Sequence, residues 1–187
     1  TLHDTPLFID DTSGLSVSEI RAKARRLKIK HPDLSLIIID YLQLIEDRSS
    51  KDRIQQISSI SRGFKSLARE LDVPIICLSQ LSRATEQRTD KRPMLSDLRE
   101  SGAIEQDADA VVLRHRKDYY EAVKDDYTAP EIEEIELIVA KNRHANPGVV
   151  KLAWHGKTGK IGEFDTEHTE PYAPTLTEID NADELPF

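Results

Sequence analysis

The sequence predicts an α/β fold in which a mostly parallel sheet is followed by late hairpin strands. Short apolar runs alternate with segments whose apolar residues recur every three or four positions, as strands do with amphipathic helices. Late in the chain the helical pattern stops, and two apolar runs flank a turn sequence at 146–148. A chain of 187 residues is long enough to bury one compact core, and a single core is expected.

The first third of the chain is expected to hold a strand, a helix and a second strand. Leu7–Ile9 has strand composition and is followed by polar turn residues. Ser16 with Glu19 three positions later forms a capping box, which predicts the start of an amphipathic helix. The opposite face of this helix is basic and is interpreted as solvated. The apolar run 34–39, which ends at Asp40, is typical of a central strand covered on both faces.

The middle and late segments extend the alternation of strands and helices. Residues 51–71 carry apolar side chains at steps of three and four, which predicts a helix, and 74–79 reads as the next strand. This strand–helix–strand unit should have parallel strands and a right-handed crossover. Three later strands are predicted at 110–113, 135–140 and 149–154.

The charge distribution leaves a nucleic-acid partner possible. The formal net charge is -8, but residues 165–187 contain seven of the 34 acidic side chains and none of the 26 basic ones. The domain is therefore expected to span 1–164, nearly neutral, with 165–187 as a disordered acidic tail. One cysteine, Cys77, lies in an apolar run, and there is neither a signal peptide nor a membrane-length apolar stretch. These features predict a protein of the reducing cytoplasm with no membrane partner.

Polar residues follow three of the predicted strands. Asp40 ends the first buried strand, Gln80 follows the second, and Lys141 and Arg143 follow the strand at 135–140. Ligands of open α/β sheets bind beyond the carboxyl ends of the strands, so these side chains are expected on one rim. The set suits a nucleoside triphosphate with Mg²⁺. A carboxylate can hold the hydrated metal, an amide can sense the terminal phosphate or the attacking water, and cations can neutralise developing charge.

The polar segment 95–110 is a second candidate site. It contains one arginine, Arg99, followed by Glu100 and Gly102, and it precedes an apolar strand. An arginine, exposed backbone amides and a glycine that permits close approach suit single-stranded nucleic acid held by its phosphates without base readout. An ordinary loop that leads into a helix explains the same residues, so both interpretations remain open.

Five blocks of the sequence share the order and composition of one known family. They are Asp40–Leu44, Leu78–Arg83, Lys91–Pro93 with Ser96–Gly102, Ile104–Asp109, and Lys141–Arg143. Together these blocks resemble the bacterial replicative DNA helicase of the DnaB type over residues 7–164. The resemblance implies a RecA-like P-loop NTPase core that uses ATP and Mg²⁺. It also implies a homo-hexameric ring around single-stranded DNA, with primase and a helicase loader as partners.

The resemblance assigns a role to each candidate residue. Asp40 would be the Walker B carboxylate that binds Mg²⁺–ATP through water, and Gln80 the switch that links phosphate state to the DNA loops. Arg143, with Lys141 beside it, would act in trans on the nucleotide of the neighbouring subunit. The DNA backbone would be held by three loop residues, namely Arg99, Glu100 and Gly102.

One motif that such a motor needs is absent from the 187 residues. The phosphate loop has the pattern Gly-x-x-x-x-Gly-Lys-Ser/Thr. Gly156-Lys157-Thr158 matches its last three letters, but Lys151 stands where the first glycine is required, so this stretch is interpreted as a hairpin turn. The chain is therefore expected to be a motor domain incomplete at its N-terminal side. Without the phosphate loop and the catalytic glutamate, it is expected to be inactive in isolation.

The leading hypothesis is part of a replicative helicase that couples ATP hydrolysis to 5′–3′ translocation on single-stranded DNA and to duplex unwinding at the replication fork. A non-enzymatic RecA-like ring partner or loading module would use the same fold without turnover. Another RecA-like ATPase, such as a recombinase, would share the Walker B logic. The Arg99–Gly102 block argues against a recombinase.

Overall fold

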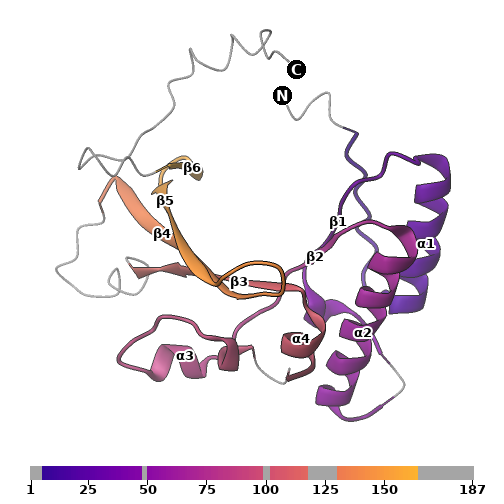
Figure 1. Cartoon of the computed structure of the whole chain (residues 1–187), viewed down its shortest axis with the longest axis horizontal. Helices are drawn as coiled ribbons and strands as arrows, with labels where there is room; N and C mark the ends of the chain where they lie inside the picture. The colour runs from indigo at the N-terminus through magenta and orange to yellow at the C-terminus, as the bar shows by residue number, and fades with distance from the viewer. Residues whose placement is uncertain (1–5, 48–49, 99–101, 118–129, 164–187) are drawn as a thin grey trace, which may run out of the picture. The chain divides into compact units, whose positions relative to one another are not determined.

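A computed structural model describes residues 6–47, 50–98, 102–117 and 130–163, which form two compact units (Figure 1). The first unit comprises Thr1–Ser82 and Leu98–Ala108, and the second comprises Arg83–Asp97 and Asp109–Phe187. Each unit has its own sheet. The contacts of the described residues thus fall into two groups, and the single core expected for the chain stays a prediction.

The first unit combines helices with a small parallel sheet. Its elements are α1 (Val17–Lys30), β1 (Ile37–Ile39), the 3-10 helix η2 (Leu42–Leu44), α2 (Arg53–Leu71), β2 (Ile75–Cys77) and α4 (Gly102–Asp107). β1 and β2 pair in parallel, with Ile37 opposite Ile75 and Ile39 opposite Cys77. The predicted strand–helix–strand unit is thus confirmed, because α2 connects two parallel neighbours.

Local sequence signals set the limits of the two long helices. At α1, the Ser16 hydroxyl accepts from the Glu19 N–H at 3.4 Å, and the Glu19 carboxylate accepts from the Ser16 N–H at 2.8 Å. This capping box satisfies helix-end donors that would otherwise lack partners. At α2, Asp52 caps the first turn by accepting from the Ile54 N–H at 3.0 Å. The helix ends at Asp72, which adopts a left-handed conformation with φ 51°.

The core of the first unit lies where α2 packs against β1 and the segment after it. Apolar side chains of α2 are buried at spacings of three and four: Ile57, Ile60, Phe64 and Leu67. The first three of these cluster with Ile39, Leu42 and Ile45. Ile60 and Leu67 are fully buried. The amphipathic pattern of the sequence therefore determines which face of α2 points inward.

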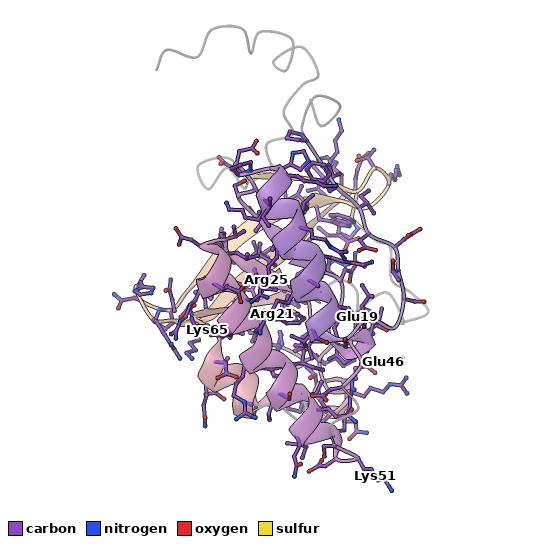
Figure 2. All side chains as sticks on the ribbon, turned by 90° about the vertical axis from the view of Figure 1, so that its right-hand side faces the viewer. Glu19, Arg21, Arg25, Glu46, Lys51 and Lys65 are labelled. Carbon is purple, nitrogen blue, oxygen red and sulfur yellow. The ribbon has the colours of Figure 1, made fainter. Side chains whose placement is uncertain are left out.

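The basic face of α1 is only partly solvated. Arg21 and Arg25 both contact Glu70 of α2, with 3.7 Å between Arg21 Nε and Glu70 Oε2. Figure 2 shows both arginines on the side of α1 that faces α2. The hydrogen bond from Arg25 lowers the pKa of the Glu70 carboxyl. Lys23 pairs with Asp10 at 2.6 Å. Several of these cations thus form ion pairs within the unit.

Two strand predictions in the first unit need correction. Leu7–Ile9 is not a strand, and its side chains are 67%, 46% and 83% exposed. A strand needs a neighbouring backbone for its hydrogen bonds, and among the described strands none pairs with this segment. The predicted central strand shrinks to three residues of β1 with one described neighbour, β2. Helices cover only one of its faces in the described part, because Ile38 is 60% exposed.

The second unit contains a four-stranded antiparallel sheet. Its strands are β3 (Ala110–Arg116), β4 (Ile132–Asn142), β5 (Gly148–His155) and β6 (Lys160–Glu163), in the order β3-β4-β5-β6. Two short helical segments precede it, α3 (Ala84–Gln87) and η3 (Leu95–Asp97). The three late strand predictions are confirmed, although each strand is longer than expected. The α/β class is confirmed: the β1–β2 sheet is parallel, and the late strands pair as antiparallel hairpins.

The segment Gly156–Gly159 is the turn between β5 and β6. Gly159 adopts φ +70°, and its N–H donates to the His155 carbonyl at 2.8 Å. This left-handed conformation suits glycine because it lacks a Cβ. The interpretation of Gly156-Lys157-Thr158 as a hairpin turn is therefore confirmed.

Two further predictions concern the tail and membranes. The predicted acidic tail, residues 165–187, lies outside the described residues. Within the described ranges, no helix combines the length and the apolar character needed to cross a bilayer.

Candidate functional site

The carboxyl ends of β1 and β2 bring two predicted site residues to the same edge of the sheet. Asp40 directly follows β1, and Gln80 lies three residues beyond β2; both are exposed. The pairing of the two chains continues past the strands, because the Leu78 N–H donates to the Ile39 carbonyl at 2.9 Å. In turn, the Leu42 N–H donates to the Leu78 carbonyl at 2.9 Å. Parallel pairing therefore puts the acid and the amide on one edge, as the sequence predicted.

Gln43 is a residue of this edge that the sequence analysis did not single out. Its side-chain Nε2 donates to the Ser79 hydroxyl at 3.0 Å and to the Gln80 carbonyl at 3.5 Å. Its Oε1 accepts from the Gln80 N–H at 3.4 Å. The sequence signal for it is its position, because a polar side chain in the turn directly after β1 can lie near the end of the adjacent strand β2. That adjacency becomes visible only when the two strands are paired.

The backbone of Gln43 is held from α2. Arg53, the first residue of α2, donates from Nη2 to the Gln43 carbonyl at 3.0 Å and from Nη1 to Gln56 Oε1 at 3.0 Å. These bonds connect the N-terminal turn of α2 to the turn that follows β1. The edge of the sheet is thus supported from the helix that packs beneath it.

Cys77, the last residue of β2, takes no part in this polar edge. Its side chain packs against the core cluster, and burial raises the pKa of its thiol to about 12. It therefore stays protonated at neutral pH, and its interpretation as a small apolar residue holds.

The predicted cations belong to the second unit. Lys141 lies within β4, paired with Val111, and Arg143 follows the strand. Arg143 contacts Asp109, through its backbone N–H to the Asp109 carbonyl at 2.8 Å and through Nη1 to Oδ1 at 3.4 Å. Among the described strands, β4 pairs with β3 and β5 and not with β1 or β2, and the common rim of these cations with Asp40 stays a prediction.

The predicted DNA loop is only partly described. Arg99 and Glu100 lie outside the described residues, whereas Gly102 is the first residue of α4. Gly102 is exposed, and a Cβ built there would meet no atom within 4 Å. Gly102 itself therefore fits the alternative interpretation, an ordinary loop that leads into a helix. The space beside it is open.

A charged pair organises the segment just before this loop. Asp97 is 4% exposed and accepts two hydrogen bonds from Arg88, at 2.9 and 2.6 Å, and one from the Met94 N–H at 2.8 Å. Burial alone would raise the pKa of the Asp97 carboxyl, but the bonds from Arg88 and Met94 outweigh it and lower the pKa. This bidentate pair ties Arg88 to η3, two residues before Arg99. This pair was not predicted from the sequence.

The fold and these residues define the chain as part of a RecA-like ATPase domain. The family described as "DnaB-like helicase C terminal domain" matches residues 1–163, and the chain belongs to that family. The chain is 54% identical over 176 residues to the "Replicative DNA helicase DnaC" of Bacillus subtilis (strain 168). It is 48% identical to the "Replicative DNA helicase DnaB" of Geobacillus stearothermophilus. Both alignments cover 93% of this chain and 37% of the relative, so the chain spans little more than a third of their length.

Solved structures give the same result. One neighbour, described as an ATPase domain, has a TM-score of 0.77 and 46% identity, and the match covers 87% of this chain and 56% of that one. A second is "The Structure Of A DnaB-Like Replicative Helicase And Its Interactions With Primase", with a TM-score of 0.76 and 46% identity. That match covers 86% of this chain and 38% of the neighbour. At 46% identity, the chain is similar to these structures in sequence as well as in fold.

Proposed function

We propose that this chain is part of the motor of a bacterial replicative DNA helicase. In the full-length protein, the motor couples ATP hydrolysis to 5′–3′ translocation on single-stranded DNA and to duplex unwinding at the replication fork. The observation that carries the proposal is the shared edge of β1 and β2, where Asp40 and Gln80 follow adjacent parallel strands. Family membership and replicative helicases at about half identity support it.

The residues of this edge fit Mg²⁺ and ATP. Asp40 offers an exposed carboxylate, and the Ser79 hydroxyl and the Gln80 amide lie on the next strand end. Mg²⁺ keeps most of its water and is bound through one or two carboxylates plus phosphates, so one exposed acid suffices. Asp40 would hold the metal through water, and Gln80 would sense the terminal phosphate. ATP supplies the phosphoryl group that is transferred to water.

Arg143 and Lys141 are proposed to act in trans within a homo-hexameric ring. Arg143 is 41% exposed, and its Nη1 lies 3.4 Å from Asp109 Oδ1. An ion pair between two partly exposed groups contributes little to stability, which suits a guanidinium that would contact a phosphate oxygen of a neighbouring subunit. The guanidinium would then stabilise charge that develops during transfer.

The DNA contacts are proposed for Arg99, Glu100 and Gly102. The open space beside Gly102 and the position of this segment after the Arg88–Asp97 pair support the assignment. A primase partner is proposed because one structural neighbour is named for its interactions with primase. A helicase loader and a cytoplasmic location are proposed from the family resemblance.

The isolated chain is proposed to be inactive as an ATPase. Its 187 residues contain no Gly-x-x-x-x-Gly-Lys-Ser/Thr pattern, and Gly156–Gly159 is a hairpin turn rather than a phosphate cradle. The cradle and the catalytic glutamate would come from elsewhere in the full-length protein. The motor portion is proposed to span 1–164, followed by the acidic segment 165–187.

An Asp40→Asn variant of the full-length protein tests the proposal. The change removes the carboxylate charge but keeps its size, so Mg²⁺-dependent ATP hydrolysis should fall by at least about a hundredfold, since metal assistance contributes several kcal/mol. Asp33→Asn is the matched control, because Asp33 is an exposed acid in the loop before β1. Equal turnover in the two variants would exclude Asp40 as the metal residue. Absence of DNA-stimulated hydrolysis in the unmodified full-length protein would favour a non-enzymatic ring partner.

A further inference from the structure

The contacts of Gln43 with Gln80 have the form of a peptide-to-peptide pair. In a parallel sheet, each strand's N–H and C=O groups bond to the neighbouring backbone. Among the described residues, the backbone hydrogen bonds between these two chains extend as far as Leu78, and the next alternate residue of the β2 chain is Gln80. The Gln43 side-chain amide contacts both, accepting from the Gln80 N–H at 3.4 Å and donating to its carbonyl at 3.5 Å. A side-chain amide thus replaces the missing strand neighbour.

These bonds restrain the main chain of Gln80 and leave its side chain available. Gln80 is exposed, and the contacts with Gln43 use only its backbone atoms. Gln43 is half-buried and is oriented by a shorter bond, from Nε2 to the Ser79 hydroxyl at 3.0 Å. The direction in which the Gln80 side chain leaves the sheet edge is therefore set by a neighbouring residue.

Gln43 is itself attached to a rigid element. Arg53 at the start of α2 donates to the Gln43 carbonyl, and this bond does not involve the Gln43 side chain. Removing the amide would therefore leave η2 attached to α2 while releasing Gln80. The line of bonds runs from α2 through Gln43 to Gln80, and each step is between groups of the first unit.

We propose that Gln43 is a positioning residue for Gln80. It holds the Gln80 backbone at the sheet edge so that the Gln80 side chain can respond to the terminal phosphate. The inference rests on the proposed function, in which Gln80 is the phosphate sensor. Hydrogen bonds between neutral groups add little net stability, whereas displacing a functional group lowers the reaction rate strongly. Loss of the Gln43 amide should therefore change turnover more than stability.

Gln43→Leu in the full-length protein is the principal test. Leucine preserves side-chain bulk but cannot bond to Ser79 or Gln80. We expect kcat for ATP hydrolysis on saturating oligo-dT to fall about tenfold to a hundredfold, as when a supporting residue of a site is removed. KM for ATP should change by less than about twofold, because ground-state binding is untouched. Gln55→Leu, an exposed glutamine near the start of α2, is the matched control and should leave both parameters unchanged.

A double-mutant cycle with Gln80→Ala separates the possible failures. If Gln43 acts through Gln80, Gln43→Leu should have no further effect on kcat once Gln80 is alanine. If the loss of kcat in the double variant is the product of the losses in the two single variants, the inference is overturned. If Gln80→Ala lowers kcat but Gln43→Leu does not, the inference is overturned and the proposed function stands. If Gln80→Ala has a normal kcat, the sensor role of Gln80 and the inference are refuted together.

Ser79→Ala provides a milder perturbation if Gln43→Leu does not assemble. It removes the hydroxyl that accepts from the Gln43 amide and that itself donates to the Gln80 carbonyl at 3.4 Å, but leaves both bonds from Gln43 to Gln80 possible. We expect the same pattern with a smaller loss of kcat, about twofold to fivefold, as suits one neutral hydrogen bond. An effect on KM alone would overturn the inference.

Discussion

Gly63 of α2 packs against Val17 at the start of α1, and Gly63→Ala should destabilise this contact. A Cβ built at Gly63 lies 2.6 Å from Val17 Cγ1 and 3.6 Å from Val17 Cβ and Cγ2. Carbon atoms pack best at about 3.5–4.0 Å, so α1 must move by about 1 Å or Val17 must change rotamer. Rotation is unfavourable, because a β-branched side chain in a helix has one strongly preferred χ1.

The expected loss of stability follows from two opposing effects. Overpacking a close contact costs about 1–3 kcal/mol, while alanine improves helix propensity over glycine by about 1 kcal/mol. The net change should be a loss of about 0–2 kcal/mol in the free energy of opening the α1–α2 contact. In a Val17→Ala background the clash disappears, and Gly63→Ala should become stabilising by up to about 1 kcal/mol.

Hydrogen exchange of the backbone amides of α1 and α2, measured by mass spectrometry, tests this cycle. The protection of both helices should fall in Gly63→Ala and recover when Val17 is also alanine, which gives a coupling of about 1 kcal/mol or more. Amides of β4 and β5 in the second unit serve as the internal reference. Increased protection of α2 in Gly63→Ala with Val17 intact would refute the reasoning, because the gain in helix propensity would then outweigh the cost of overpacking against Val17.

Three further predictions concern charged residues. Asp97→Asn should destabilise the second unit by about 3 kcal/mol, the low end for a broken buried pair because Arg88 is partly exposed. Because the folded pKa of Asp97 is lowered, its contribution is present above the unfolded pKa and is lost as pH falls through the folded pKa, so acid unfolding of the variant should show a shallower pH dependence. Arg143→Ala should lower kcat of the full-length ATPase by about 10³–10⁵ with ATP affinity nearly preserved in a binding titration; equal losses in both would exclude a finger role. Arg99→Ala should weaken single-strand binding for every sequence and reduce the salt slope by about 0.7 for each phosphate that the protein no longer neutralises, and an unchanged slope would exclude this role for Arg99.

Local signals in the sequence predicted the two long helices and the late hairpins well. Ser16 with Glu19 marked the start of α1 because a capping box involves only residues three positions apart. The spacing of apolar residues identified the buried face of α2 for the same reason. The Gly156–Gly159 turn was predictable because a glycine at positive φ and a short turn between apolar runs are local features. Each of these signals lies between residues close in the chain, even where the structure that it predicts packs against distant segments, as the buried face of α2 does.

Predictions failed where a structure depended on distant partners. Leu7–Ile9 has strand composition, but a strand forms only where another backbone offers hydrogen bonds. The apolar run before Asp40 suggested two covered faces, yet coverage depends on which elements pack there, and Ile38 remains 60% exposed in the described structure. The expected single rim required β4 to join the sheet of β1 and β2. In the described residues β4 pairs with β3 and β5 instead, which is a pairing between distant segments that the sequence did not predict, and the common rim stays a prediction.

By itself, the sequence determined the family blocks, the order of the elements and the identity of the acid and amide at the ends of β1 and β2. Only the tertiary structure decided that Gln43 bonds to the backbone of Gln80 and that Asp97 is buried against Arg88. The physical reason is that a side-chain hydrogen bond depends on position and direction to within a fraction of an ångström. For residues 37 positions apart, such as Gln43 and Gln80, that precision arises from strand pairing and helix packing.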